Sequence, residues 1–275
     1  MNGIDGGAGG GPAGRGATGI GLERPGRHAA GATAVADAST TGATELFTVA
    51  ALGYASQRPG HALTLLQAGC TTAGRAPDIE KLRASGYDVA VSLIDDDNAA
   101  ARATVAADPG LASCTLADLR VVPLTPRSFD IVHCTLLERI ANAELVLDRL
   151  VDTLRPGGLL LLRTGDRDSA AGFLDRVLPR PFRSLIWRGR RLRPYPAVYE
   201  RVVSGRGIQS YAQRRGLVIS QRQALSLVTA RARPPSGLMP ACRLVERLSL
   251  GRLSCAHDEL CYVIRKPEPG FARVL

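Results

Sequence analysis

Three acidic residues follow apolar segments at places where a parallel sheet would carry them along one edge. Asp95 and Asp96 come directly after the apolar run 87–94, and Asp118 follows the shorter run 113–117. Open α/β sheets bind ligands at the carboxyl ends of their strands, so we expect these carboxylates to border a ligand crevice. A carboxylate there can accept hydrogen bonds from both hydroxyls of a ribose. This predicts an adenosine-bearing cofactor on Asp95 or, one residue along, on Asp96.

The same region also allows structural interpretations. The acidic cluster can cap the helix expected over residues 98–107, with Asp97 as the cap. Asp118 can be an ordinary loop residue. Asp130 opens an apolar run at its amino end, away from the crevice, which favours a structural role. His133 and its polar neighbours alternate faces along a strand and lack an orienting partner, so we predict no catalytic side chain.

A turn rich in small residues follows the apolar run 61–68. Residues 66–74 read Leu-Gln-Ala-Gly-Cys-Thr-Thr-Ala-Gly, and Gly69 lets the backbone approach a ligand closely because it has no Cβ atom. The spacing also mimics a dinucleotide-binding turn whose middle glycine is replaced by Thr71, so a nicotinamide-dependent oxidoreductase stays open. A phosphate-binding P-loop is excluded, because Arg75 stands where that motif requires lysine.

Residues 113–163 alternate between strand-like and helix-like segments. Apolar runs at 113–117, 131–136 and 159–163 are separated by a loop and by a helix predicted over residues 143–154. This alternation is typical of a parallel sheet with right-handed crossover connections.

The particular residues of this stretch resemble class I S-adenosylmethionine-dependent methyltransferases. In that family an Asp ends the third strand, a Phe-Asp pair opens the fourth, and Leu-Arg-Pro-Gly-Gly turns into the fifth. This sequence matches these places in order, with Asp118, residues 129–130 and residues 154–158. The resemblance covers residues 58–267. It implies a doubly wound α/β fold, with a mostly parallel seven-stranded sheet, an antiparallel last strand and helices on both faces.

The resemblance also implies S-adenosyl-L-methionine as the cofactor. The carboxylate of Asp118 would accept from the adenine amine, and the backbone N–H of Leu119 would meet a ring nitrogen. His133 is expected to line the pocket, or instead to satisfy a hydrogen bond in the core. The expected cofactor-binding residues are Ala68, Gly69, Cys70, Thr71, Asp95, Asp96, Asp118, Leu119 and His133.

The first motif departs from the family pattern. That pattern is Asp/Glu-x-Gly-x-Gly-x-Gly, but here Gln67 replaces the acid, and Thr71 and Ala73 replace the later glycines. The first hypothesis is therefore a methyltransferase that acts on a small-molecule acceptor. The second is a non-catalytic, methyltransferase-like binding or scaffold protein whose cofactor site has eroded.

Charge and composition bear on partners and location. A net charge of +10 is a feature of proteins that bind nucleic acid, so nucleic acid is one candidate partner. We do not favour one, because nearly all the basic residues are arginines, as GC-rich coding predicts, and residues 180–233, rich in arginine, show no RNA-binding module.

No apolar run reaches the ~18–20 residues that a membrane span needs. The six cysteines form neither a metal-ligand spacing nor a CxxC pair, which favours the cytoplasm. The oligomeric state is not predicted.

The amino-terminal segment differs from the rest of the chain. Thirteen glycines fall within the first 42 residues, with few large apolar side chains to offset the entropy of folding. We therefore expect a disordered leader over residues 1–45. Residues 46–270 are expected to form one methyltransferase-like domain, in which residues 179–215 are a cap on the acceptor side.

Overall fold

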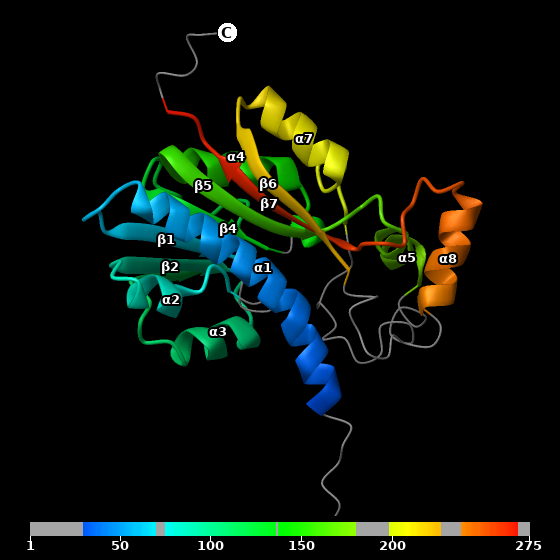
Figure 1. Ribbon diagram of the computed structural model, residues 1–275, viewed down its shortest axis with the longest axis horizontal. Helices are drawn as coiled ribbons and strands as arrows, with labels where there is room; N and C mark the ends of the chain where they lie inside the picture. The colour runs from blue at the N-terminus through cyan, green and yellow to red at the C-terminus, as the bar shows by residue number, and fades with distance from the viewer. Residues whose placement is uncertain (1–29, 70–74, 136, 180–197, 227–237, 269–275) are drawn as a thin grey trace, which may run out of the picture.

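A seven-stranded sheet runs through the molecule, and helices lie on both of its faces (Figure 1). The computed structural model describes residues 30–69, 75–135, 137–179, 198–226 and 238–268. The strands are β1 (Leu63–Ala68), β2 (Val89–Asp95), β3 (Ser113–Leu116), β4 (Phe129–Cys134), β5 (Leu154–Gly165), β6 (Val218–Leu225) and β7 (Glu259–Arg265). Their order is β3-β2-β1-β4-β5-β7-β6, and β7 pairs antiparallel with both of its neighbours. The predicted fold class is confirmed.

Two apolar cores lie on opposite faces of the sheet. The helices are α1 (Ala30–Ser56), α2 (Ile79–Ala84), α3 (Ala99–Ala106), α4 (Ala143–Thr153), α5 (Ala170–Val177), α7 (Gly205–Arg214) and α8 (Leu238–Leu248), with a 3₁₀ turn η1 (Leu137–Arg139). One core joins the sheet to α4 and α7, and the other joins it to α1 and α2. Adjacent residues Leu65 and Leu66 of β1 enter different cores, because successive side chains of a strand point to opposite faces. Double burial explains the apolar runs of β1 and β5, whereas the short edge strand β3 is largely exposed.

Several helix boundaries refine the expectations from the sequence. Helix α1 begins at Ala30, inside the segment 1–45 that we expected to be disordered, because a run rich in alanine favours helix. Residues 1–29 lie outside the described ranges. The cap of α3 is Asn98, whose side chain accepts from the Ala101 amide, and not Asp97, which pairs with Arg102.

The cap predicted over residues 179–215 is only partly described. Residues 180–197 lie outside the described ranges, while α7 packs into a core through Ile208 and Tyr211. In the described ranges, no helix has the length and apolar character needed to cross a bilayer.

The Leu-Arg-Pro-Gly-Gly segment is the first part of β5 and not a separate turn. The pairing of β4 with β5 shifts register between Phe129 and Ile131. A Cβ atom at Gly158 would lie 2.8 Å from the carbonyl oxygen of Asp130. Glycine is therefore required where the irregular start of β5 passes the β4 backbone.

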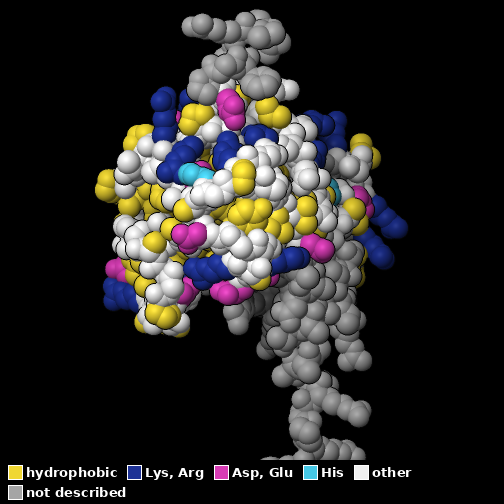
Figure 2. All heavy atoms as spheres, turned by 60° about the vertical axis from the view of Figure 1, so that its left-hand side comes forward, with side chains coloured by type: hydrophobic (Ala, Val, Ile, Leu, Met, Phe, Trp, Pro, Cys, Tyr) yellow, Lys and Arg dark blue, Asp and Glu magenta, His cyan; other side chains and the backbone are white. Residues whose placement is uncertain are grey.

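The carboxylate of Asp130 joins the amino ends of β1, β4 and β5. It is fully buried and accepts from the Tyr54 hydroxyl at 3.1 Å, the Thr64 amide at 2.9 Å and hydroxyl at 2.8 Å, and Arg155 Nη1 at 2.7 Å. His61 Nε2 lies 3.1 Å away. On the face of the molecule that carries these strand ends, Lys and Arg side chains surround an exposed histidine (Figure 2). The structural role predicted for Asp130 is confirmed.

Burial alone would raise the pKa of Asp130, but hydrogen bonds from Thr64 and Arg155 outweigh it, and the pKa lies below its ordinary value. A carboxyl with a depressed pKa stabilises the fold above its unfolded-state pKa, and this stability is lost as the pH falls through the folded-state pKa. We expect Asp130→Asn to lower the free energy of unfolding at pH 7 by about 3 kcal/mol, because a charged acceptor of several donors is lost.

Urea unfolding at pH 7 and at acid pH checks this expectation, with exposed Asp88→Asn as the matched control. The difference between the Asp130 variant and the parent should shrink as the pH falls. An equal effect of the two substitutions at pH 7 would contradict the role assigned to Asp130.

Candidate functional site

The carboxyl ends of β1, β2 and β3 form one continuous edge. The Gly69 amide donates to the Ile94 carbonyl at 3.0 Å, and the Ala117 amide donates to the Asp95 carbonyl at 2.9 Å. Backbone hydrogen bonds therefore continue past the last paired residues of the strands. They bring the turn after β1, the acids after β2 and the loop after β3 to neighbouring positions, as the sequence predicts.

Gly69 begins the turn after β1 and needs to be glycine for two reasons. Its φ is +69°, a left-handed conformation that side chains rarely adopt. An added Cβ atom would lie 2.8 Å from the carbonyl oxygen of Thr135. Thr135 follows β4, its amide donates to the Ala68 carbonyl at 3.1 Å, and its hydroxyl donates to the Gly69 carbonyl. The end of β1 is thus fixed against the end of β4.

The acids after β2 lie in a field of negative charge. Asp95 is buried, with 6% of its surface exposed, and one of its oxygens accepts from the Asp96 amide at 2.8 Å. Desolvation raises the pKa of Asp96, and the charges of Asp95 and Asp118 raise it further. Three carboxylates with mutual repulsion favour a ligand that brings hydrogen-bond donors or positive charge.

The loop after β3 offers one donor and one occupied acceptor. The two oxygens of Asp118 accept from Arg120, with Oδ2 2.6 Å from Nη2, and this pairing lowers the pKa of Asp118. The backbone N–H of Leu119 donates to no residue that the structure describes. The loop therefore fits an acceptor atom at Leu119 directly, whereas a donor can reach Asp118 only by sharing its oxygens with Arg120.

His133 lies in the core under α1, while Cys70 and Thr71 lie outside the described residues. The His133 side chain is 1% exposed, and its ring packs edge-on against Phe47 with 5.4 Å between ring centroids. Its Nδ1 lies 2.8 Å from Gln67 Oε1. Of the two roles open for His133, the structure supports the hydrogen bond in the core.

Two residues near this edge were not predicted from the sequence. Thr135 fixes Gly69, and its only signal is a hydroxyl side chain directly after a buried strand. Gln67 looked like a lost acid, but both ends of its amide are engaged. The contacts of Thr135 with Gly69 and of Gln67 with His133 each join residues 66 positions apart in the chain, so no local pattern reveals them.

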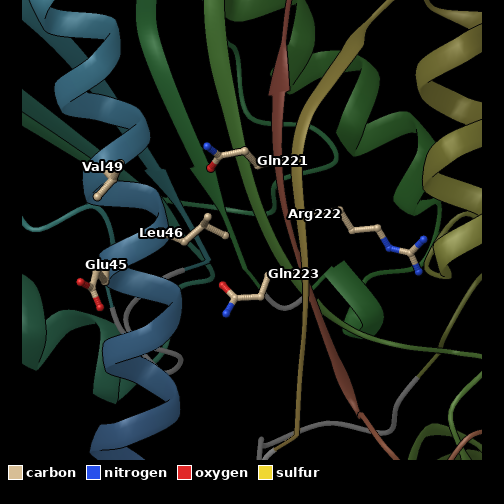
Figure 3. A pocket seen from close by; sticks show the side chains of 6 residues that line it. All are labelled: Glu45, Leu46, Val49, Gln221, Arg222 and Gln223. Carbon is tan, nitrogen blue, oxygen red and sulfur yellow. The ribbon is translucent and has the colours of Figure 1, made fainter.

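Hollows also occur away from the strand ends. One, of about 430 Å³, lies between α1 and the edge strand β6 and is lined by Glu45, Leu46, Val49, Gln221, Arg222 and Gln223 (Figure 3). It is open and shallow, and its acidic and basic side chains are few. Its lining has one carboxylate, Glu45, and not the group of acids that lies at the strand ends.

Comparisons with known proteins agree with this geometry. Residues 66–162 match a family model for a methyltransferase domain. A protein of Galdieria sulphuraria named as a sarcosine dimethylglycine methyltransferase is similar in structure, with a TM-score of 0.54, 14% identity, and coverage of 82% of this chain and 85% of that one. An S-adenosylmethionine-dependent methyltransferase from Mesorhizobium loti has a TM-score of 0.48 at 16% identity, covering 74% and 91% of the two chains. No curated protein sequence matches the chain.

The matched segment begins in β1 and ends in β5, so it contains every strand end described above. The sheet order is that of the Rossmann-like methyltransferase fold, and the segment 66–162 within it matches a methyltransferase-domain model. The resemblance found in the sequence is confirmed. The match supports S-adenosylmethionine as the cofactor, and the acid-rich edge with its glycine turn fits a cationic, hydroxyl-bearing ligand.

The close approach at Gly69 can be separated from its backbone conformation. Gly86 has a similar φ of +88°, but an added Cβ atom there would have no neighbour within 4 Å. We expect Gly86→Ala to cost about 1 kcal/mol. Gly69→Ala should cost about 1–3 kcal/mol more, because its methyl group meets backbone. Urea denaturation measures both, and equal costs would show that the β1–β4 contact does not restrict residue 69.

Proposed function

We propose that this protein is an S-adenosylmethionine-dependent methyltransferase that acts on a small-molecule acceptor. The observation that carries the proposal is the group of three carboxylates beside the Gly69 turn, at the edge where open α/β sheets bind ligands. Adenosine presents hydroxyl and amine donors, and the sulfonium is positively charged. A ligand of this kind relieves the repulsion among Asp95, Asp96 and Asp118.

Each residue of the edge has a proposed task. Asp95 accepts from the ribose hydroxyls, and Asp96 is its neighbour in the same role. The Leu119 amide donates to a ring nitrogen of adenine, and Asp118 accepts from the exocyclic amine while Arg120 shares its oxygens. Ala68 and Gly69 bring backbone close to the methionine end. Cys70 and Thr71, which lie outside the described residues, are proposed to bind the same part of the cofactor.

The cofactor supplies an already activated methyl group, so the chain's main task is to orient two reactants. Positioning alone can lower a barrier substantially, because it removes the entropy of bringing the groups together. No described side chain is therefore assigned as an acid or base. The similar fold of a protein named for small amines supports a small acceptor. A cytoplasmic location, based on the cysteine pattern, belongs to this proposal.

Two observations favour the alternative of a non-catalytic binding protein with this fold. Arg120 already occupies the oxygens of Asp118, and the turn after β1 keeps only Gly69 of the first three motif glycines. In that case the adenosine site would be weak or lost. Binding of the demethylated product, S-adenosylhomocysteine, to the purified protein separates the two functions more directly than an activity assay, because the methyl acceptor is not yet identified.

Asp95→Asn tests the proposed ribose contact. We expect the affinity for S-adenosylhomocysteine to fall by about 1.5–3 kcal/mol, or roughly ten- to 150-fold, because a charged acceptor loses its hydrogen bonds. Asp97→Asn, two residues along and paired with Arg102 on the surface, is the matched control and should leave the affinity unchanged. Isothermal titration calorimetry measures both.

Two outcomes would oppose the proposal. Parent protein that is folded but gives no heat with millimolar S-adenosylhomocysteine would favour the scaffold alternative. Equal affinities of the Asp95 variant and the parent would place the cofactor somewhere other than the end of β2.

A further inference from the structure

The carboxylate of Asp118 is occupied by a single residue, Arg120, two positions along the chain. Its Oδ1 accepts from the Arg120 amide at 2.8 Å and from Nε at 3.0 Å, while its Oδ2 accepts from Nε at 2.9 Å and from Nη2 at 2.6 Å. An ionised carboxylate has about four lone-pair sites. These contacts therefore use its capacity, and an amine donor from a ligand has to replace a contact of the guanidinium.

The backbone of this loop does not depend on the Arg120 side chain. The Asp118 carbonyl accepts from the amides of Val121 at 3.0 Å and Val122 at 2.9 Å, and the Leu119 side chain is buried. The amide of residue 120 holds Oδ1 whatever its side chain is. The guanidinium can thus leave the carboxylate while the Leu119 N–H and the carboxylate keep their positions.

The ion pair lies at the surface, where it can open. The side chains of Arg120 and Asp118 are 44% and 37% exposed. Pairs of exposed ions contribute little to stability, because water and salt replace their contacts readily. The hydrogen bond with Asp118 raises the pKa of Arg120, and the charge of Asp96 raises it further. A second carboxylate of the same edge therefore lies within electrostatic range of this guanidinium.

We propose that Arg120 is a tethered competitor for the adenine end of the cofactor site. In the empty protein its guanidinium holds the acceptor atoms of Asp118, and the adenine amine of the cofactor displaces it toward solvent and Asp96. Arg120 thereby lowers the affinity for ligands that bring an adenine amine and sets the concentration at which the site fills. This inference deepens the proposed function and rests on it.

Arg120→Met tests the competition, because methionine keeps an unbranched apolar stem and donates no hydrogen bond. We expect the affinity for S-adenosylhomocysteine to rise about two- to fivefold, as the usual strength of an exposed ion pair implies. Arg102→Met is the matched control. Arg102 forms a similar fork with Asp97, from Nε at 2.6 Å and Nη2 at 2.7 Å, so this change removes the same charge and should leave the affinity unchanged. Isothermal titration calorimetry measures both.

A double-mutant cycle shows whether Arg120 acts through Asp118. Asp118→Asn removes the charge that holds the guanidinium, so Arg120→Met should give no further gain in that background. Correspondingly, Asp118→Asn should reduce the affinity more in the Arg120→Met protein than in the parent. A merely structural effect of Arg120 on the loop would give the same gain in both backgrounds, and that result would overturn the proposal.

A second variant and a second ligand support the same test. Lysine at residue 120 keeps the charge but cannot form two parallel hydrogen bonds, so the affinity of Arg120→Lys should lie between those of the parent and Arg120→Met. Adenosine is neutral, and salt screens the exposed ion pair without screening a charge on this ligand. Its affinity for the parent should therefore rise more with salt than its affinity for Arg120→Met, and equal salt dependence would contradict the competition.

The outcomes separate this inference from the proposed function. If neither the parent nor Arg120→Met gives heat with millimolar S-adenosylhomocysteine, the proposed function and the competition are both refuted. If the parent binds and Arg120→Met binds equally or more weakly, the competition alone is refuted. An equal gain in Arg102→Met also overturns it, because net charge would then explain the effect. A gain in Arg120→Met that disappears with Asp118→Asn supports it.

Discussion

The buried carboxylate of Asp130 is the interaction on which the arrangement of the central strands depends. It accepts hydrogen bonds from the end of α1, the start of β1 and the start of β5. It therefore fixes three segments relative to one another, although β5 is distant from the other two in sequence. A charge in the core is tolerated only when its hydrogen bonds replace those of water. Because the amino ends of β1 and β4 are fixed in this way, their register carries through to the carboxyl ends, where Gly69 and Thr135 meet.

The two edges of the sheet have different electrostatic character, and this difference gives the site its chemistry. The amino edge neutralises one carboxylate with Arg155 and several neutral donors. At the carboxyl edge Arg120 pairs with Asp118, but the charges of Asp95 and Asp118 still raise the pKa of Asp96. Folding does not relieve this repulsion around Asp96. A ligand that carries hydrogen-bond donors can relieve it by binding there. The same edge holds the Gly69 turn and the amide of Leu119. Hydrogen-bond donors, hydrogen-bond acceptors and a backbone that a ligand can approach closely therefore lie together. These features support the proposal that this edge binds an adenosine-bearing cation.

The fold could be predicted from the sequence because its signals are local. Each of these signals can be read within a few residues. They are the apolar runs of the buried parallel strands, the strand end at Asp118 and the glycines before residue 159. The disordered leader was expected to reach residue 45, but α1 begins at Ala30, because alanine-rich sequence favours helix even where glycine is frequent. The sequence predicted which strand ends lie side by side, and the ligand site at that edge stays a prediction. The roles of Thr135 and Gln67 and the location of His133 depend on contacts across the sheet. Such contacts arise from register, which a single sequence does not display.

A crystal structure of the protein with S-adenosylhomocysteine tests the central claim most directly. The account predicts the adenosine across the carboxyl ends of β1, β2 and β3, with the ribose hydroxyls within hydrogen-bond distance of Asp95 and an adenine nitrogen facing the Leu119 amide. A ligand bound in the hollow between α1 and β6, or an empty strand edge at saturating ligand, would contradict it.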